Sequence, residues 1–324
     1  MKRREIILAS GALAVLGAAS VQAQPAPRRI AWLGSGTAES QAENLSAFRA
    51  RLKELGYVEG SNVVLDIRWA DGNLERTPVL AREVVALKPA VIVTGGSTAV
   101  GALKKETTTV PIVFGALGDP VEQGIVQSLS RPGGNITGVT VRTELNLKLL
   151  DIVRETLPKA RRIAILEHET EPVARKSTAA FERAAAPLGF RVSALRVKEA
   201  GDLARALAQA LQGKADALLS PTFALFSIQA QQIAEWAIKV RCPSFGAFRP
   251  HAAKGGLMSY YSDTRESYRR AAELADKILK GANPGDLPVE QPDRFRLLIN
   301  LRTAKALGIR IPQSVLVRVD EVIE

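Results

Sequence analysis

The sequence predicts an α/β protein with two lobes, each built on an open parallel sheet. Its 324 residues exceed the usual length of one domain, which is about 100–200 residues. Short β-branched runs alternate with amphipathic helical stretches, the pattern of parallel strands covered by helices. No long polar linker separates the two series of elements, so we expect segments that cross directly between the lobes.

The first series of strands and helices follows a proline-rich stretch at residues 25–27. A strand is expected at residues 30–33, and apolar residues at helical spacing ahead of Gly56 predict a helix over residues 40–55. Alternating apolar and charged residues predict a half-exposed strand at residues 65–69, which suits an edge of the sheet. The remaining strands of this series are expected at residues 90–94, 110–114 and 136–141.

Two helices of the first series have a proline near their start. The pairs Thr77-Pro78 and Asp119-Pro120 each place a capping residue before a proline at the first helical position. We therefore expect helices over residues 77–87 and 119–129.

The second series begins with a helix expected over residues 145–157. The single cysteine, Cys242, cannot form an internal disulfide, and we expect it to be a small buried hydrophobic residue rather than a nucleophile. Helices are expected between the strands of this series. These strands are expected at residues 162–166, 190–195, 216–220 and 243–247.

The N-terminus has the features of a secretory signal peptide. Basic residues at positions 2–4 precede an apolar run at residues 6–19, and Val21 and Ala23 fit the −3 and −1 positions of a cleavage site. The run is shorter than the ~20 residues that span a bilayer. We expect residues 1–23 to be removed after export by either the general secretory or the twin-arginine route.

The composition bounds the location and the partners of the mature chain, which is expected to begin at Gln24. No cysteine near the cleavage site could accept a lipid, so we expect a periplasmic monomer rather than a lipoprotein. The net charge of +11 first suggests a nucleic-acid or membrane partner. However, the basic residues are scattered, aromatic residues make up only 5%, and no nucleic-acid motif is present, so a solvated basic surface is expected.

Small and hydroxyl-bearing residues follow the strands of the first series. In open parallel sheets the ligand crevice lies beyond the carboxyl ends of the strands. Ser35 follows the first strand, and Gly96, Ser97 and Thr98 open a helix whose N–H groups and dipole would attract an anion such as a carboxylate. A simple capping role for Ser97 or Thr98 is equally open, and for Asp119 the capping role is preferred.

The matching positions of the second series carry a histidine and several aromatic residues. Thr222, Phe223 and Phe248 follow strands, and with Tyr260 the two phenylalanines would form a wall against an apolar or aromatic ligand. Ordinary core packing is the alternative for the phenylalanines. His168 lies between two glutamates, but the chain offers no metal-ligand spacing, so a histidine at the mouth of the crevice is expected and no metal or cofactor.

Enzyme signatures are missing from the sequence. Gly34-Ser35-Gly36 lacks the third glycine of a dinucleotide fingerprint, and neither a phosphate-binding loop nor a nucleophile elbow occurs. We therefore expect a binding protein rather than an enzyme.

Five segments resemble one large family, in the same order along the chain. The family is the ABC-transporter substrate-binding family that includes the tryptophan/tyrosine-binding proteins. The segments are GYVEG at residues 56–60, GDPV at 118–121, RPGGNITG at 131–138, GGLMSY at 255–260, and the C-terminal stretch from Leu287 through Ile311-Pro312 to Glu324.

The resemblance implies a fold of the periplasmic-binding-protein type I, in which the chain crosses between the lobes three times. The crossings would lie near Val141, Tyr260 and Pro288. The N-terminal lobe would comprise residues 28–142 and 260–287, and the C-terminal lobe residues 143–259 and 288–324.

The resemblance also implies a function. The protein would capture a small organic solute, with an aromatic or apolar amino acid or organic acid favoured, and pass it to the membrane permease and ATPase of an importer. A periplasmic sensor subunit is the alternative, followed by a secreted enzyme. Members of the family carry Asn-Pro after the first strand of the second lobe, where this chain has Glu167-His168-Glu169, so the identity of the ligand stays open.

Overall fold

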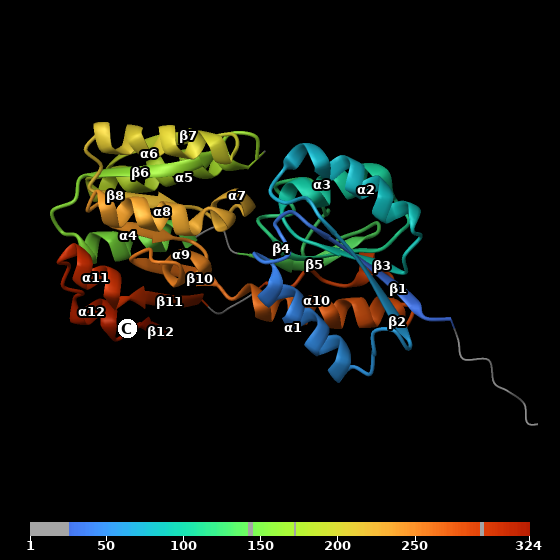
Figure 1. Cartoon of the computed structure of the whole chain (residues 1–324). Helices are drawn as coiled ribbons and strands as arrows, with labels where there is room; N and C mark the ends of the chain where they lie inside the picture. The colour runs from blue at the N-terminus through green and yellow to red at the C-terminus, as the bar shows by residue number, and fades with distance from the viewer. Residues whose placement is uncertain (1–25, 142–144, 172, 292–294) are drawn as a thin grey trace, which may run out of the picture.

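The chain folds into two α/β lobes that lie side by side (Figure 1). The structure is a computed structural model that describes residues 26–141, 145–171, 173–291 and 295–324. One lobe contains a five-stranded sheet and the other a seven-stranded sheet. This arrangement confirms the predicted fold class. The expected signal peptide lies outside the described residues.

The sheet of the first lobe is entirely parallel, with its second strand at the edge as the alternating pattern predicts. Its inner strands are buried because helices cover both faces. In spatial order the strands are β2 (Val63–Trp69), β1 (Arg28–Gly34), β3 (Val91–Thr94), β4 (Ile112–Leu117) and β5 (Ile136–Thr140).

Successive residues of β1 face opposite layers of helices. Ile30 and Trp32 belong to the core under α1 and α10, whereas Ala31 and Leu33 belong to the core under α2 and α3. Helix α10 reaches this lobe from late in the sequence and lies against α1 (Figure 1). The helices are α1 (Ala42–Glu54), α2 (Thr77–Ala86), α3 (Ser97–Glu106) and α10 (Thr264–Leu279).

The sheet of the second lobe is mixed. Strand β11 runs antiparallel to β10, and every other pair of neighbouring strands in this sheet is parallel. In spatial order the strands are β12 (Glu321–Ile323), β11 (Phe295–Asn300), β10 (Met258–Ser262), β9 (Ser244–Gly246), β8 (Ala217–Ser220), β6 (Arg162–His168) and β7 (Arg191–Val197).

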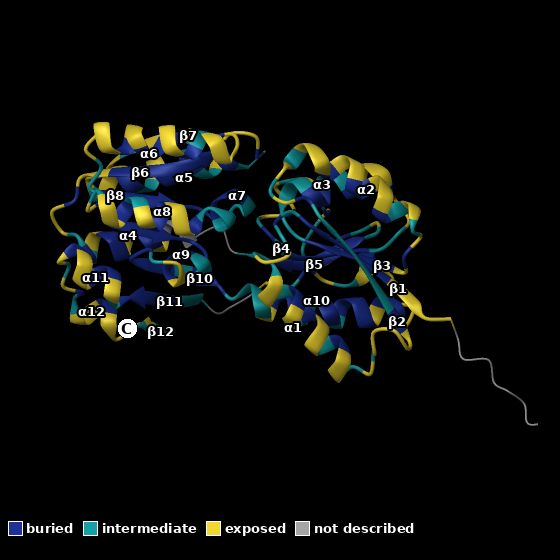
Figure 2. Cartoon of the chain, in the orientation of Figure 1, coloured by how far each residue is buried: buried dark blue, intermediate teal, exposed yellow. Residues whose placement is uncertain are grey.

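Helices cover this second sheet and expose their outer faces to solvent, while the central strands are buried (Figure 2). No helix among the described residues is both long enough and apolar enough to cross a membrane. The helices are α4 (Leu145–Thr156), α5 (Ala174–Ala185), α6 (Leu203–Gln212), α7 (Ala224–Ile228), α8 (Ala230–Lys239), α9 (Arg249–Ala253), α11 (Leu301–Leu307) and α12 (Gln313–Leu316).

Three segments of the chain pass between the two lobes. The first follows β5, and the second follows Ser262, since β10 stays in the second sheet up to that residue. The third follows Glu290, whose carbonyl accepts a hydrogen bond from the Thr140 N–H at 2.8 Å. The first and third crossings therefore start side by side. Asp263 begins the return by capping α10 through the Arg265 N–H.

One predicted helix is wrong, and one prediction about a buried residue is confirmed. The Asp119 carboxylate does accept the N–H groups of Val121 and Glu122 at 3.0 and 2.9 Å. The helix expected after it is replaced by turns, because Gly124 adopts a left-handed conformation with φ of 64° that stops helix propagation. Cys242 is buried as expected, and burial raises the pKa of its thiol to about 12.

Candidate binding site

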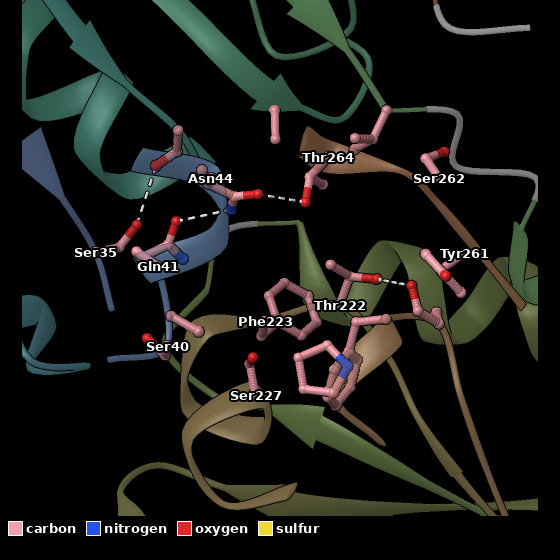
Figure 3. A pocket seen from close by; sticks show the side chains of 18 of the residues that line it. Ser35, Ser40, Gln41, Asn44, Thr222, Phe223, Ser227, Tyr261, Ser262 and Thr264 are labelled. Atoms are coloured by element: carbon pink, nitrogen blue, oxygen red, sulfur yellow. Dashed lines mark hydrogen bonds between the residues drawn. The ribbon is translucent and has the colours of Figure 1, made fainter. Parts of the chain in front are cut away.

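A cavity of ≈ 380 Å³ lies between the lobes. Both sheets contribute the loops that follow their strands, as expected for an open parallel sheet, and Figure 3 shows side chains from the two sides facing one another across the space. The volume is at the lower end of the usual range for small-molecule sites, about 300–1,000 Å³. The cavity can enclose a molecule of the size of an amino acid.

The first lobe lines the cavity with Ser35, Gly96 and Ser97. The Ser35 hydroxyl donates a hydrogen bond to the Gly95 carbonyl at 3.0 Å, which joins the loops after β1 and β3. Gly96 stands directly before α3 with φ of 84°, a conformation that glycine adopts without strain. The first N–H groups of α3 have no partner within the helix, so they give this side of the cavity hydrogen-bond donors and a positive potential.

Tyr268 of α10 lies beneath these loops and is almost completely buried. Its ring packs on Trp32 with centroids 4.9 Å apart. A Cβ atom on Gly115 would lie 2.4 Å from the Tyr268 ring, and one on Gly95 would lie 2.4 Å from its hydroxyl oxygen. Glycine at both positions therefore lets α10 support the cavity wall from below.

The second lobe lines the cavity with Thr222, Phe223 and Phe248. The Thr222 hydroxyl donates a hydrogen bond to the Ala247 carbonyl at 2.7 Å, which fixes the loop after β8 to the loop after β9. Phe223 is half-buried and packs edge-on against Phe226, with ring centroids 6.1 Å apart. The two phenylalanines, with Pro221 and Ala224, give this side of the cavity an apolar patch.

Four of the residues expected at the site do not line the cavity. His168 is 2% exposed and lies behind Phe223, with ring centroids 5.9 Å apart, and burial lowers its pKa to about 4. Asp119 caps its own turn and is exposed. Tyr260 points to the opposite face of β10, where it stacks on Phe295. Thr98 is turned toward the second lobe.

The sequence interpretation also missed residues that do line the cavity. Gln41 and Asn44 come from the start of α1, and Tyr261 follows Tyr260 on the alternate face of β10. The Thr264 hydroxyl donates to the Asn44 side-chain oxygen at 2.8 Å, and the Asn44 amide donates to Gln41 at 3.0 Å (Figure 3). Two side-chain amides at the start of the helix after β1, one at its N-cap and one in its first turn, were the available signal.

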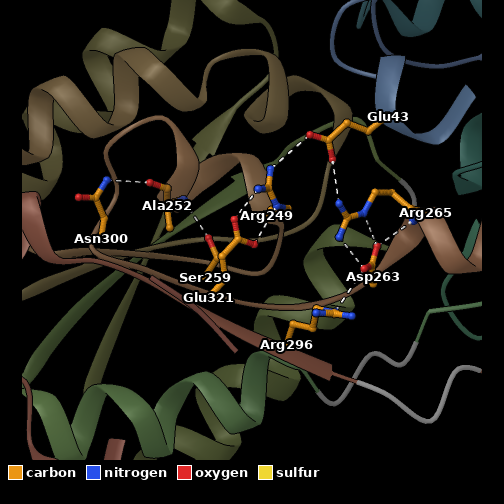
Figure 4. Close-up of polar contacts among 9 residues, drawn as sticks. All are labelled: Glu43, Arg249, Ala252, Ser259, Asp263, Arg265, Arg296, Asn300 and Glu321. Atoms are coloured by element: carbon orange, nitrogen blue, oxygen red, sulfur yellow. Dashed lines mark hydrogen bonds and ion pairs between the residues drawn. The ribbon is translucent and has the colours of Figure 1, made fainter. Parts of the chain in front are cut away.

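Several charged side chains line the cavity, and Figure 4 shows the ion pairs that they form. Arg249 forms ion pairs with Glu43 of the first lobe at 3.2 Å and with Glu321 of β12 at 2.5 Å. Asp263 pairs with Arg265 at 2.7 Å, and these contacts lower the pKa of Asp263 against the opposing effect of burial. These ion pairs form a network that connects the two lobes beside the cavity.

One acidic residue inside the cavity has a different environment. Glu171, in the loop after β6, is 9% exposed, and its carboxylate accepts a hydrogen bond from the Thr98 hydroxyl of the other lobe at 3.0 Å. Burial raises the pKa of Glu171, an effect that the Thr98 hydrogen bond partly offsets. Within the described ranges, no group of three or more metal-ligating side chains is placed to hold a metal ion.

A family model described as ABC transporter substrate binding protein matches residues 37–323. The chain belongs to this family. The protein is therefore the substrate-binding component of an ABC transporter, located outside the cytoplasm. The assignment supports a binding protein rather than an enzyme, as the sequence predicts.

Relatives agree with the family assignment and with the fold. The chain is 27% identical over 263 residues to the tyrosine-binding protein of Clostridioides difficile (strain R20291), covering 81% of this chain and 76% of that protein. A conserved domain protein of Vibrio cholerae superposes with a TM-score of 0.86 at 27% identity, over 91% of this chain and 99% of that one. The ABC domain of Streptococcus pneumoniae in complex with L-Trp superposes with a TM-score of 0.85 at 24% identity, over 92% and 100%.

Proposed function

We propose that this substrate-binding protein captures an amino acid or organic acid carrying an aromatic or bulky apolar group in the cavity between its lobes. The observation that carries the proposal is the division of the cavity into two unlike sides. The N-terminus of α3 offers donors on one side, and Phe223 and Phe248 offer an apolar wall on the other.

A carboxylate of the ligand would occupy the N-terminus of α3. The loop before this helix brings Ser35, Gly96 and Ser97 to one wall of the cavity. Free N–H groups and the helix dipole favour an anion there by about 0.3–1 kcal/mol when the site is exposed, and by more when it is partly buried. Closure of the lobes around the ligand would strengthen these contacts by excluding water.

An apolar group of the ligand would pack against the second lobe. Aromatic pairs add ~0.5–1.5 kcal/mol to the free energy of burying their area. Phe223 and Phe248 both line the cavity, although Phe248 is 6% exposed and also packs in the core of the second lobe. Two of the relatives also support an aromatic ligand, since one is a tyrosine-binding protein and the other is a structure in complex with L-Trp. An uncharged sugar would leave the donors at α3 without an anion.

The protein would reach its place of action by export. Residues 1–23 would be removed as a signal peptide, and the mature chain would begin at Gln24 and deliver its ligand to the permease and ATPase of the importer. Mass spectrometry of the protein recovered from a periplasmic extract tests this step. A chain that retains Met1, or one that carries a lipid, would contradict it.

A thermal-shift screen tests the ligand class. The mature protein, unfolded and refolded to remove any bound molecule, would be heated with aromatic and aliphatic amino acids, with aromatic carboxylic acids and with sugars. A ligand at 100 times its dissociation constant stabilises the folded state by ~2.7 kcal/mol. We expect aromatic amino acids or aromatic acids to raise the melting temperature. A shift produced by uncharged sugars alone would overturn the proposal.

A further inference from the structure

Glu171 differs from every other charged residue that lines the cavity. Within the described part of the chain it forms no ion pair, and its carboxylate has the Thr98 hydroxyl as its one side-chain partner. Each of the other charged residues of the lining has an opposite charge within 4.0 Å. These pairs are Glu39–Lys254, Glu43–Arg249 and Asp263–Arg265.

Burying the Glu171 carboxylate without an opposite charge beside it costs free energy. A carboxylate taken out of water without an opposite charge loses several kcal/mol of hydration free energy, and one neutral hydroxyl donor restores only part of it. Glu171 is 9% exposed, so water cannot solvate it freely when the lobes are together. A cationic group placed in the cavity would compensate the charge.

The position of Glu171 defines where such a cation would lie. Its carboxylate lines the cavity and accepts a hydrogen bond from Thr98, the second residue of α3, which lies in the other lobe just outside the cavity lining. Ser97, at the proposed carboxylate site, is the neighbouring residue and also lines the cavity. An acceptor for a cation and donors for an anion therefore lie next to one another at the same end of one helix. An α-amino acid carries its ammonium and carboxylate groups on a single carbon atom, which matches this arrangement.

We infer that Glu171 binds the ammonium group of the ligand and thereby selects a zwitterionic α-amino acid over a carboxylic acid with the same apolar group. The inference rests on the proposed function, because it assumes that the ligand carboxylate occupies the N-terminus of α3. Glu171 contributes from the second lobe while Thr98 holds its carboxylate from the first, so the ammonium site is complete only when the lobes are closed.

Calorimetric titration with matched ligand pairs tests the inference. The pairs are L-phenylalanine with 3-phenylpropionate and L-tryptophan with indole-3-propionate, which differ only in the ammonium group. We expect the wild-type protein to bind the amino acid of a pair about 10–100-fold more tightly, the effect of one charged hydrogen bond. In Glu171→Gln this preference should fall at least tenfold, with the affinity for the acid unchanged or higher.

Two controls separate this effect from a general loss of charge or of fold. Glu169→Gln removes a negative charge from the same loop at an exposed position outside the cavity lining, and it should leave the preference intact. The ligand-free Glu171→Gln protein should melt at the same temperature as wild type or higher, because an uncompensated buried charge has been removed.

The outcomes distinguish the two levels of the proposal. Equal binding of acid and amino acid by the wild type, or an undiminished preference in Glu171→Gln, would overturn the inference and leave the proposed function standing. If the wild type binds neither member of either pair and instead binds a sugar, the proposed function fails and this inference fails with it. Equal binding by the wild type would overturn the inference even if Glu171→Gln does not fold.

Discussion

The Glu43 carboxylate lies 3.2 Å from the Arg249 guanidinium and connects the first helix of one lobe to a short helix of the other. Arg249 is itself anchored by Glu321 of β12, and Glu43 also lies 3.9 Å from Arg265 (Figure 4). Because Glu43 and Arg249 belong to different lobes, a movement of the lobes apart would break their contact. The pair therefore favours the closed arrangement.

Replacing Glu43 should shift the equilibrium toward the open form. The Glu43 side chain is 59% exposed, and exposed ion pairs contribute about 0.2–1 kcal/mol. We expect Glu43→Gln to weaken ligand binding by that amount, mainly through faster dissociation, and to reduce the salt dependence of the affinity. Surface plasmon resonance at two ionic strengths checks this, with Glu106→Gln as a control outside the cavity lining. A salt dependence equal to that of wild type would contradict the role of the pair.

Phe223 should matter for affinity more than for stability. It is half-buried and faces the cavity, whereas its neighbour Phe226 is fully buried in the core. We expect Phe223→Ala to weaken binding of an aromatic ligand by about 1–3 kcal/mol. Phe226→Ala should instead lower the free energy of unfolding by about 3–5 kcal/mol. Calorimetry and urea denaturation measure the two quantities, and normal affinity in Phe223→Ala would remove the ring from the ligand site.

The buried histidines make stability depend on pH below neutrality. Burial lowers the pKa values of His168 and His251 to about 4, whereas an unfolded histidine titrates near 6.5. Between these values the unfolded chain binds more protons, so the free energy of unfolding decreases as the pH falls, by at most about 1.4 kcal/mol per pH unit for each histidine. Glu171 acts in the opposite direction, because its raised pKa favours protonation of the folded state.

Urea denaturation between pH 7 and pH 5 measures this dependence. We expect a smaller loss of stability over the interval in His168→Gln than in wild type, because one of the two buried histidines is gone. An equal pH dependence in the two proteins would show that His168 does not contribute.

His251 also imposes a requirement for glycine on a neighbouring strand. A Cβ atom on Gly246 would lie 2.4 Å from the His251 Cβ, and His251 is fully buried with Nε2 3.1 Å from the Ser244 hydroxyl. Gly246→Ala should therefore destabilise the protein by about 1–3 kcal/mol through overpacking. Gly201→Ala, where a Cβ would meet no atom within 4 Å, is the matched control in thermal denaturation. Equal melting temperatures for the two variants would contradict this account.

The alternation of strands and helices could be predicted because each lobe repeats one local pattern. The sequence could not exclude the helix expected after Asp119, because Asp119 does cap the turn and Pro120 does follow it. The left-handed conformation of Gly124, which ends this turn, could not be read from the sequence. The antiparallel insertion of β11 also had no local signal. Strand direction depends on where the crossing segments return the chain, which is a property of the whole fold.

The sequence predicted those site residues that come directly after the ends of strands. Ser35, Ser97 and Phe223 line the cavity for that reason. The Tyr260 assignment failed by one residue, because side chains alternate along a strand and Tyr261 has the inward position. Glu171 was missed because β6 continues to His168, two residues past its expected end, so the loop that reaches the cavity starts later.

A crystal structure of the protein with L-phenylalanine or L-tryptophan would show where and in which orientation the ligand binds. We predict that the ligand lies between the lobes, with its carboxylate at the N-terminus of α3 and its ring against Phe223 and Phe248. A ligand bound outside this cavity, or one whose ring occupies the α3 end while its carboxylate faces the phenylalanines, would contradict the account.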